Sequence, residues 1–439
     1  MSSRVLFVAY HFPPIGGAGT QRPLKFVRYL PSLGFEPAVL TGPGSTGGRW
    51  SPADDSFARE VPPGVPVIRV PGPEPPPTTG IDRVRRLCLL RSRWEEWWSR
   101  QVQAAVGPED FDVIWATGPP YATLEAAALL AVRSKRPWIA DLRDLWAFDE
   151  MAIYTSAIHR RHERRRMERT LAGAAAIVTT APTATAALKK NLPSLASRTV
   201  TITNGFDPID FAVTSTRRSP DRFRIVHTGY LHTDAGLKQG RLSRRLLGGG
   251  ARGVQILTRS HVYLLRAVEK LLAQDPSLGE RLEVCLAGVL SSADQEIAAR
   301  SPITRILGYL PHTESIALMR SADLLFLPMQ NKPGNSRSTT IPGKTFEYLA
   351  SGRPILAAVP AGDARDLLVE AGADVCSPDD TDGMARAIRR RLDMHSFGGP
   401  DELNAEGVVR PFERSRLASS LAAILKDVLD GQAPEPRVA

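Results

Sequence analysis

The sequence contains few cysteines and no long apolar run. Three of its 439 residues are cysteines (Cys88, Cys285 and Cys376), and they form neither a CxxC pair nor a cluster with histidine. This excludes a disulfide framework and a cysteine-based zinc site, and it favours a reducing compartment. No apolar stretch approaches the roughly 20 residues of a membrane span. The first residues, MSSRVLFVAYHFPP, do not have the form of a secretory signal. We therefore expect a cytoplasmic protein, with peripheral contact at the inner face of a membrane left open.

The composition indicates a folded chain of more than one domain. A hydrophobic content of 43% and a charged content of 23% exclude a disordered protein. A length of 439 residues exceeds that of one ordinary core. The net charge of +10 would suit nucleic acid or an anionic membrane. No recognised nucleic-acid module is present, so we expect no nucleic-acid partner.

Apolar runs of strand length alternate with helical stretches along the chain. They extend from 4–10 to 199–205 and, after an aperiodic segment at 207–223, from 224–230 to 373–378. Near-continuous apolar strands between helices predict an α/β fold with two doubly wound parallel sheets. Ligands of such sheets bind beyond the carboxyl ends of the strands. We predict an N-terminal, acceptor-side Rossmann-like domain at 1–212, a C-terminal Rossmann-like domain at 213–410, a helix packing back across the domains at 411–430, and a flexible tail at 431–439.

The tripeptide Gly343-Lys344-Thr345 has the residues of a P-loop but not its spacing. The first glycine of G-x-x-x-x-G-K-[ST] should be residue 338, which is serine, and the preceding apolar run ends about a dozen residues upstream. An ATPase or GTPase is therefore not indicated.

A short helix beginning here explains the segment better. Thr339 or Thr340 can cap it, and its N-terminal N–H groups and dipole favour a phosphate. Glu347, about one turn further, can accept hydrogen bonds from two ribose hydroxyls. An ordinary surface pair of Lys344 and Glu347 is the alternative.

A second glycine-rich turn follows the first strand. Gly16, Gly17 and Gly19 allow close approach of the main chain to a ligand. The turn is not G-x-G-x-x-G, and the second strand ends in AVLTG without the acidic residue that would bind a nicotinamide ribose. This argues against a dinucleotide-dependent oxidoreductase. A tight turn without any ligand is the alternative.

Longer motifs, spread over most of the chain, contain the two segments that could bind a phosphate. In the second half they are NGFD, HTGYL, GYLPHTESIALMRSADLLFLPM and IPGKTFEYLASGRPILA; in the first half they are FPPIGGAGTQRPLKFVRYLPSLGFEPAVLT, GPPYATLEAAALLA and PWIADLRDLW. Together they resemble glycosyltransferase family four. The resemblance implies the GT-B fold, with two facing Rossmann-like domains and a central cleft. It also implies transfer of a sugar from a nucleoside-diphosphate-sugar to a hydroxyl of a glycan, lipid-linked or natural-product acceptor, with retention and without a metal or other cofactor.

The resemblance also assigns the C-terminal donor motif. Glu347 matches the second of the two family glutamates, which binds the ribose. The first should fall at Thr339, so this sequence departs from the family there. Main-chain groups at Pro342, Gly343 and Lys344 would then hold the sugar and the diphosphate.

Other donor residues follow from the same resemblance. Gly17 matches the opening-loop glycine that faces the diphosphate, and Gly229 lies in the matching HTGYL motif. Tyr309 and Leu310 match the loop flanking the base. The family uses a basic pair after the first strand of the second domain; Lys238 and Arg241 are the candidates, within a basic insertion at 236–253. An exposed basic loop is the alternative.

On the acceptor side, three charged residues follow a predicted strand. Asp141, Arg143 and Asp144 stand at its carboxyl end, where a carboxylate could take the acceptor proton or stabilise a positive sugar carbon. We favour Asp144 over Asp141 and give His11 a weaker claim. A structural salt-bridge cluster and a structural histidine are the alternatives.

A membrane contact is suggested by two basic segments. Residues 83–100 place apolar residues and three tryptophans at helical spacing between arginines, and 159–173 adds a basic helix. Tryptophan beside arginine suits a membrane interface or an amphipathic acceptor. Core packing with a solvated basic face is the alternative.

Two further functions stay open. A nucleotide-sugar epimerase of the same architecture would release a rearranged sugar without an acceptor. An inactive homologue that binds sugar nucleotides is suggested by the threonine at position 339.

Overall fold

The computed structural model divides the chain into two compact units. It describes residues 2–46, 52–76, 80–107, 109–212, 222–239, 249–251, 253–332, 334, 336–396, 403 and 405–435. The first unit is Met1–Asn204 with Leu247–Gly250 and Arg414–Ala439; the second is Gly205–Leu246 with Ala251–Glu413. The first unit thus ends before residue 212, and the helix expected at 411–430 groups with it. No helix in these described ranges is long and apolar enough to cross a membrane.

The first unit contains a sheet of seven parallel strands in the order β3-β2-β1-β4-β5-β6-β7. The strands are β1 (Ser3–Val8), β2 (Phe35–Thr41), β3 (Val67–Arg69), β4 (Val113–Gly118), β5 (Trp138–Leu142), β6 (Ala176–Thr179) and β7 (Thr199–Thr201). Each overlaps one of the apolar runs of the first half. The predicted parallel sheet is therefore confirmed.

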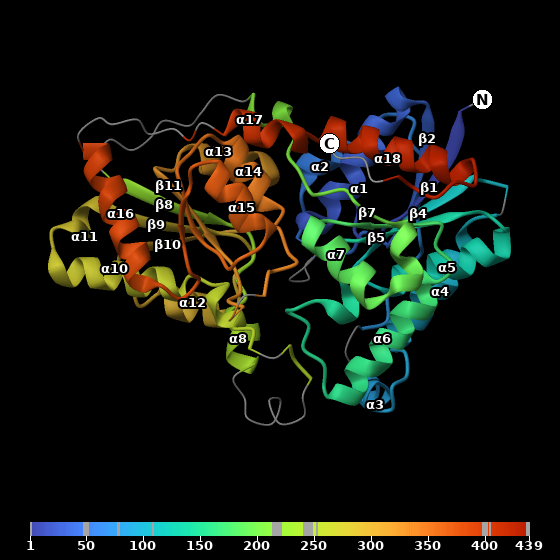
Figure 1. Cartoon of the computed structure of the whole chain (residues 1–439), viewed down its shortest axis with the longest axis horizontal. Helices are drawn as coiled ribbons and strands as arrows, with labels where there is room; N and C mark the ends of the chain where they lie inside the picture. The colour runs from blue at the N-terminus through green and yellow to red at the C-terminus, as the bar shows by residue number, and fades with distance from the viewer. Residues whose placement is uncertain are drawn as a thin grey trace. The chain divides into compact units, whose positions relative to one another are not determined.

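Helices cover both faces of this sheet, because successive strand residues point to opposite sides. Val5 and Phe7 pack on the side of α1 (Ala18–Tyr29) and α18 (Arg414–Leu429). Leu6 and Val8 pack on the side of α4, α5 and α6 (Figure 1). The remaining helices are α2 (Asp55–Ala58), α3 (Gly80–Leu87), α4 (Arg93–Ala105), α5 (Ala122–Ser134), α6 (Ala157–Leu171) and α7 (Pro182–Asn191).

The second unit contains six parallel strands in the order β10-β9-β8-β11-β12-β13. They are β8 (Phe223–Thr228), β9 (Leu282–Ala287), β10 (Thr304–Gly308), β11 (Leu324–Pro328), β12 (Ile355–Ala358) and β13 (Asp374–Cys376). Each again overlaps a predicted run. The two parallel sheets with interleaved helices give the predicted two-domain α/β fold.

Helices also cover both faces of the second sheet (Figure 1). Its main core joins the strands to α10 and α16, while α13, α14 and α15 lie on the other side. The helices are α8 (Thr233–Gln239), α10 (Val262–Gln274), α11 (Leu278–Arg281), α12 (Ser292–Ala298), α13 (His312–Arg320), α14 (Lys344–Ala350), α15 (Asp363–Glu370), α16 (Thr381–Ser396) and α17 (Glu406–Val409).

Both sheets reverse their strand order at one point. The reversal lies between β1 and β4 in the first unit and between β8 and β11 in the second. Loops leaving neighbouring strands at such a point diverge to opposite faces and leave a crevice beyond the carboxyl ends. Each unit therefore has one topologically favoured position for a ligand.

Candidate functional site

In the second unit, three glycines bring main-chain segments together at the carboxyl ends of β8, β9 and β10. Gly229, Gly288 and Gly308 have φ of +97°, +143° and +71°, values that favour glycine. The N–H of Gly229 donates to the carbonyl of Ala287 at 2.7 Å, and that of Gly288 to the carbonyl of Gly308 at 2.7 Å. A Cβ on Gly288 would lie 2.4 Å from the carbonyl oxygen of Gly229. The turns at Gly229 and Gly288 therefore leave no room for side chains, whereas Gly308 has open space around it.

Lys344 reaches this edge from α14. Its ammonium donates to the carbonyl of Thr228 at 2.5 Å and lies 3.3 Å from Nε2 of His227. A Cβ on Gly229 would come within 2.9 Å of the same Nζ atom. Burial, followed by the charge of Arg259, lowers the pKa of Lys344 from 10.5 to about 7. The amine is therefore poised to gain a proton when an anion binds.

His227 stays neutral beside this amine. Its Nδ1 lies 3.0 Å from the carbonyl oxygen of Phe326. Because a carbonyl can only accept, Nδ1 carries the hydrogen and Nε2 is free to accept from Lys344. Burial and the charge of Lys344 hold the pKa of His227 well below its ordinary value.

Arg259 is the cation that the sequence analysis missed. It follows the insertion, donates to Oε1 of Gln330 at 3.1 Å, and its charge lowers the pKa of Lys344. Of the two predicted basic residues, Lys238 is half exposed on α8 with Asp234 as its ion-pair partner at 4.0 Å, and Arg241 lies outside the described residues. Lys238 lies in the last turn of α8, where its i,i+4 pair with Asp234 accounts for the position of its side chain.

Glu347 lies one turn into α14 and is buried. Its Oε1 is 3.9 Å from Nδ1 of His312, whose Nε2 is 3.1 Å from Oδ2 of Asp210. His312, which is also buried, therefore stands between two carboxylates and restricts the position of Glu347. The sequence pattern did not single out this histidine.

The start of α14 differs in one respect from the prediction. Gly343 is the N-cap residue and no side chain caps the helix, so the expected cap from Thr339 or Thr340 is wrong. The main-chain N–H of Thr340 instead donates to the hydroxyl of Ser338 at 3.3 Å. This hydrogen bond holds the segment before Gly343 outside the helix. In the described part of the chain, no acceptor binds the N–H groups of Gly343 and Lys344. They remain available to a ligand.

The other predicted donor residues lie in the loops that follow β10 and β11. Pro342 is buried directly before the helix, and Thr339 is half-buried. Tyr309 and Leu310 are half-buried in the loop that follows β10. Gly229, the loop at 309–310 and the segment 339–347 thus follow β8, β10 and β11, whose carboxyl ends share one edge of the parallel sheet. Lys238 is exposed, and Arg241 lies outside the described residues.

In the first unit, His11 and Arg143 converge on the glycine-rich turn. Gly17 has φ of +88° and is the N-cap of α1, and the N–H of Gly16 donates to the carbonyl of Pro52 at 2.7 Å. A Cβ on Gly19 would lie 2.9 Å from a guanidinium nitrogen of Arg143 and 3.4 Å from the His11 ring. The turn therefore presents main chain beside two polar side chains.

His11 is uncharged at neutral pH. Burial and the charge of Arg143 lower its pKa from 6.5 to about 4. Its Nδ1 is buried and has no partner among the described residues. A neutral imidazole with an unused nitrogen can donate to or accept from a bound hydroxyl.

The two aspartates of the predicted acceptor side have different environments. Asp141 is fully buried and accepts from Arg22 at 2.8 Å and from the hydroxyl of Thr117 at 2.7 Å. Arg22 also donates to the carbonyls of Ile202 and Thr203. Arg22 and Thr117 therefore donate hydrogen bonds to both carboxylate oxygens of Asp141, which gives this residue a structural role.

Asp144, by contrast, is exposed. Burial lowers the pKa of Arg143, and the negative charge of Asp144 opposes that shift. Burial raises the pKa of Tyr121, and the charge of Asp144 adds to that rise. It is the aspartate of this loop whose carboxylate is open to a substrate.

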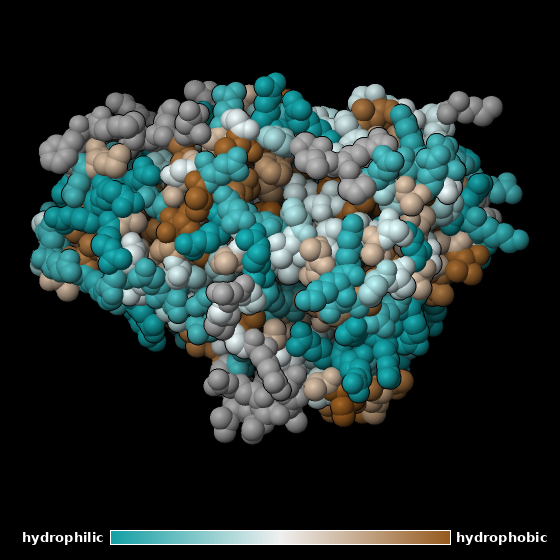
Figure 2. Space-filling model, in the orientation of Figure 1, coloured by the Kyte–Doolittle hydropathy of each residue, from teal (hydrophilic) through white to brown (hydrophobic). Residues whose placement is uncertain are grey.

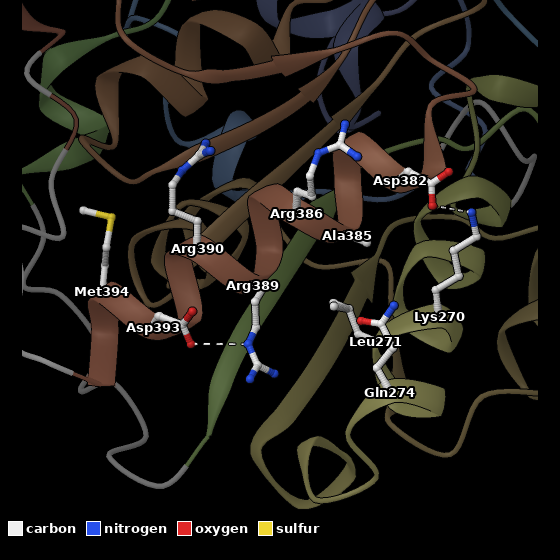
Figure 3. A pocket seen from close by; sticks show the side chains of 10 residues that line it. All are labelled: Lys270, Leu271, Gln274, Asp382, Ala385, Arg386, Arg389, Arg390, Asp393 and Met394. Atoms are coloured by element: carbon white, nitrogen blue, oxygen red, sulfur yellow. Dashed lines mark hydrogen bonds and ion pairs between the residues drawn. The ribbon is translucent and has the colours of Figure 1, made fainter.

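A separate cavity of about 850 Å³ lies between α10 and α16 (Figure 3). Arginines of α16 and Lys270 of α10 line it, with ion pairs from Lys270 to Asp382 and from Arg389 to Asp393. None of its ten lining residues is a predicted site residue. It is not part of the candidate site.

Comparison with known protein families assigns a class to both halves of the chain. The glycosyl transferase 4-like domain matches residues 16–205, and glycosyl transferases group 1 matches residues 255–394. The chain belongs to the glycosyltransferases of GT-B fold and is a transferase enzyme. No curated protein matches the sequence significantly.

Solved structures share the fold at low sequence identity. HepE of Anabaena in complex with UDP-glucose is 16% identical with a TM-score of 0.60, over 97% of this chain and all of that chain. Sucrose-phosphate synthase of Thermosynechococcus elongatus is 13% identical with a TM-score of 0.67, over 98% and 100%. A putative UDP-N-acetylglucosamine 2-epimerase of Listeria monocytogenes is 13% identical with a TM-score of 0.56, over the whole of both chains.

Proposed function

We propose that this enzyme transfers a sugar from a nucleoside-diphosphate-sugar to a hydroxyl acceptor as a member of glycosyltransferase family four. The observation that carries the proposal is the amine of Lys344, which lies beside the Gly229 turn and within the electrostatic influence of Arg259 and Glu347. At the start of the same helix, no acceptor among the described residues binds the N–H groups of Gly343 and Lys344. Two cations and a helix start suit a diphosphate, and a buried carboxylate one turn away suits a ribose diol. HepE, a structural relative, was solved with UDP-glucose.

The roles follow from the charges that change during transfer. The bond from the anomeric carbon to the β-phosphate oxygen breaks, and the diphosphate leaves with the electron pair. Lys344 and Arg259 stabilise that growing negative charge, as preorganised donors do in other enzymes. Main-chain groups from Pro342 to Lys344 hold the sugar, since residue 339 is threonine rather than glutamate.

The acceptor hydroxyl forms the new bond to the anomeric carbon and gives up its proton. We assign this proton to the leaving diphosphate, on the face that gives retention, with the exposed carboxylate of Asp144 assisting the positive sugar carbon. His11 and Arg143 supply hydrogen bonds beside the glycine-rich turn that follows β1. At this turn, Gly17 allows the main chain to come close to a ligand. The acceptor is a hydroxyl of a glycan, lipid-linked or natural-product molecule, and the reaction uses no metal.

A nucleotide-sugar epimerase is the second candidate, because the Listeria relative carries that description and covers the whole chain. An epimerase would convert the donor sugar with no acceptor present. A transferase would instead release the nucleoside diphosphate. The release would be slow when the sugar is transferred to water and faster when it is transferred to an acceptor.

A donor panel tests the proposal. The protein is incubated with UDP-, GDP- and TDP-sugars, with and without a chelator, while thermal stability and nucleotide release are followed. We expect the sugars of one nucleotide class to raise the melting temperature of the protein. The same donors should be hydrolysed slowly, at equal rates with and without the chelator. Absence of both stabilisation and release with every donor would contradict catalysis, and a rearranged sugar nucleotide would identify the epimerase.

A further inference from the structure

The first unit carries an exposed apolar surface on α3 and at the start of α6. Ile81, Val84 and Leu87 recur every three residues along α3 and are 59%, 59% and 69% exposed. Leu90 just after α3 and Ile158 on α6 are 56% and 72% exposed. Figure 2 shows this end of the first unit as an apolar area bordered by hydrophilic residues. Single exposed apolar side chains are ordinary, but four on two helices together with one in the loop after α3 mark a contact surface.

Hydrogen bonds hold α3 with this side outward. The carboxylate of Asp82, which is buried, accepts from the main-chain N–H of Arg93 at 2.9 Å. The guanidinium of Arg85 donates to the main-chain carbonyl of Arg91 at 2.7 Å and also pairs with Glu96. These contacts attach the Asp82 side of α3 to α4. The three apolar residues of α3 consequently remain in solvent although the helix is anchored.

Four arginines surround the apolar residues. Arg83 and Arg86 on α3 and Arg161 and Arg165 on α6 are exposed. No carboxylate pairs with any of the four in the ranges that the structure describes. Burial lowers the pKa of His159 near the start of α6, and the charge of Arg86 adds to that shift, so Arg86 of α3 lies within electrostatic range of this end of α6. The surface therefore combines an apolar centre with unneutralised positive charge.

We infer that this surface, defined by Ile81, Val84, Leu87, Leu90 and Ile158 with the four arginines, docks on an anionic lipid bilayer. The apolar side chains enter the boundary between headgroups and acyl chains, and the guanidinium groups bind lipid phosphates. Charge selects this partner over a second copy of the chain. A two-fold contact through one patch would bring two identical sets of arginines together.

The docking surface differs from the one expected from the sequence. The segment 83–100 forms two helices, and its tryptophans do not supply the lipid contact. Trp98 is fully buried, and Trp94 and Trp97 pack against the same core. The apolar residues of α3, which precede the tryptophans in the sequence, make the lipid contact instead. This inference stands on the surface alone and holds whichever sugar nucleotide the enzyme uses.

Vesicle sedimentation of the full-length protein tests the inference. The vesicles consist of phosphatidylcholine alone or mixed with phosphatidylglycerol. We expect binding to the mixed vesicles that weakens as salt is raised, and little binding to phosphatidylcholine. The variant Ile81→Glu/Val84→Glu/Leu87→Glu should lose at least about tenfold in partition coefficient. Arg83→Gln/Arg86→Gln should bind less and show a weaker salt dependence.

Leu129→Glu/Val132→Glu is the matched control, because Leu129 and Val132 are exposed apolar residues of α5 in the same unit. It should bind the mixed vesicles as the unmodified protein does. Far-UV circular dichroism of each variant confirms that it is folded. Equal binding by the α3 variant and the control would overturn the inference. So would a dimer in sedimentation equilibrium that only the α3 substitutions convert to a monomer, since the surface would then be an interface between copies.

Discussion

At the scale of single residues, Lys344 determines how donor binding depends on pH. Burial and Arg259 lower its pKa to about 7, so the free enzyme holds a largely neutral amine above that pH. A bound diphosphate favours the charged form and raises the pKa. Binding above pH 7 must therefore take up a proton. The unfolded chain keeps the ordinary value of 10.5, so this group makes folding stability rise with pH between about 7 and 10.5.

We therefore predict that the affinity for the nucleoside diphosphate falls by about tenfold per pH unit above pH 7. Calorimetric titration at pH 8 in two buffers of different ionisation enthalpy measures the proton uptake directly. Lys344→Met is the control and should bind more weakly with no such uptake. Equal uptake in both proteins would show that another group titrates.

The aspartates of the β5 loop allow a second test at this scale. Asp141→Ala leaves Arg22 buried without its counter-charge, which should cost about 3–5 kcal/mol of unfolding free energy. Asp144→Ala removes an exposed carboxylate from the same loop and should cost at most about 0.5 kcal/mol. Urea unfolding followed by near-UV circular dichroism compares the two. Similar losses would refute the structural assignment of Asp141.

At the scale of elements, the turn after β8 must remain free of side chains. Gly229→Ala places a methyl group at a φ of +97° and 2.9 Å from the Lys344 amine. Gly352→Ala imposes a similar strain at a φ of +68°, with nothing within 4 Å. Both variants should lose about 1–2 kcal/mol of stability. Only Gly229→Ala should also lose donor affinity, by roughly tenfold or more, because it displaces the amine. Calorimetric titration with the donor nucleotide distinguishes them, and equal affinities would contradict the role given to this turn.

The strands were predictable from the sequence, whereas several contacts at the site were not. Strands buried on both faces are nearly continuous apolar runs, and each of the runs overlaps a strand. Arg259 was missed because the insertion at 236–253 separates it from the glycine turn that it approaches. The partner of Asp141 is 119 residues away along the chain, a distance over which spacing gives no information.

Helical spacing failed at 83–100 for a related reason. One period runs through Val84, Leu87 and Trp98, but Ser92 begins a new helix with a capping box. The break turns the tryptophans toward the core and leaves the earlier residues in solvent. Periodicity gives the residues of a face, but only the tertiary packing decides what covers that face.

At the scale of the whole molecule, the last helix completes the core of the first unit. Leu417, Leu421 and Leu425 of α18 are buried with residues of α1 and the first sheet. Leu421→Ala should cost about 2–5 kcal/mol. Ser419→Ala on the exposed side of α18 should cost at most about 0.5 kcal/mol. Denaturant unfolding compares them; an unchanged stability of Leu421→Ala would mean that α18 does not contribute to that core.

The account of the whole enzyme depends on one claim, that Glu347 binds the donor ribose beside a diphosphate held by Lys344. A calorimetric double-mutant cycle tests it most directly. The preferred nucleoside diphosphate and its 2′-deoxy analogue are titrated into the unmodified protein and into Glu347→Ala. We predict that loss of the 2′-hydroxyl weakens binding to the unmodified protein by about tenfold, as expected for one hydrogen bond to a charged group, and does not weaken binding to Glu347→Ala. An equal loss in both proteins, or an unchanged affinity of Glu347→Ala for the full nucleotide, would contradict the assignment.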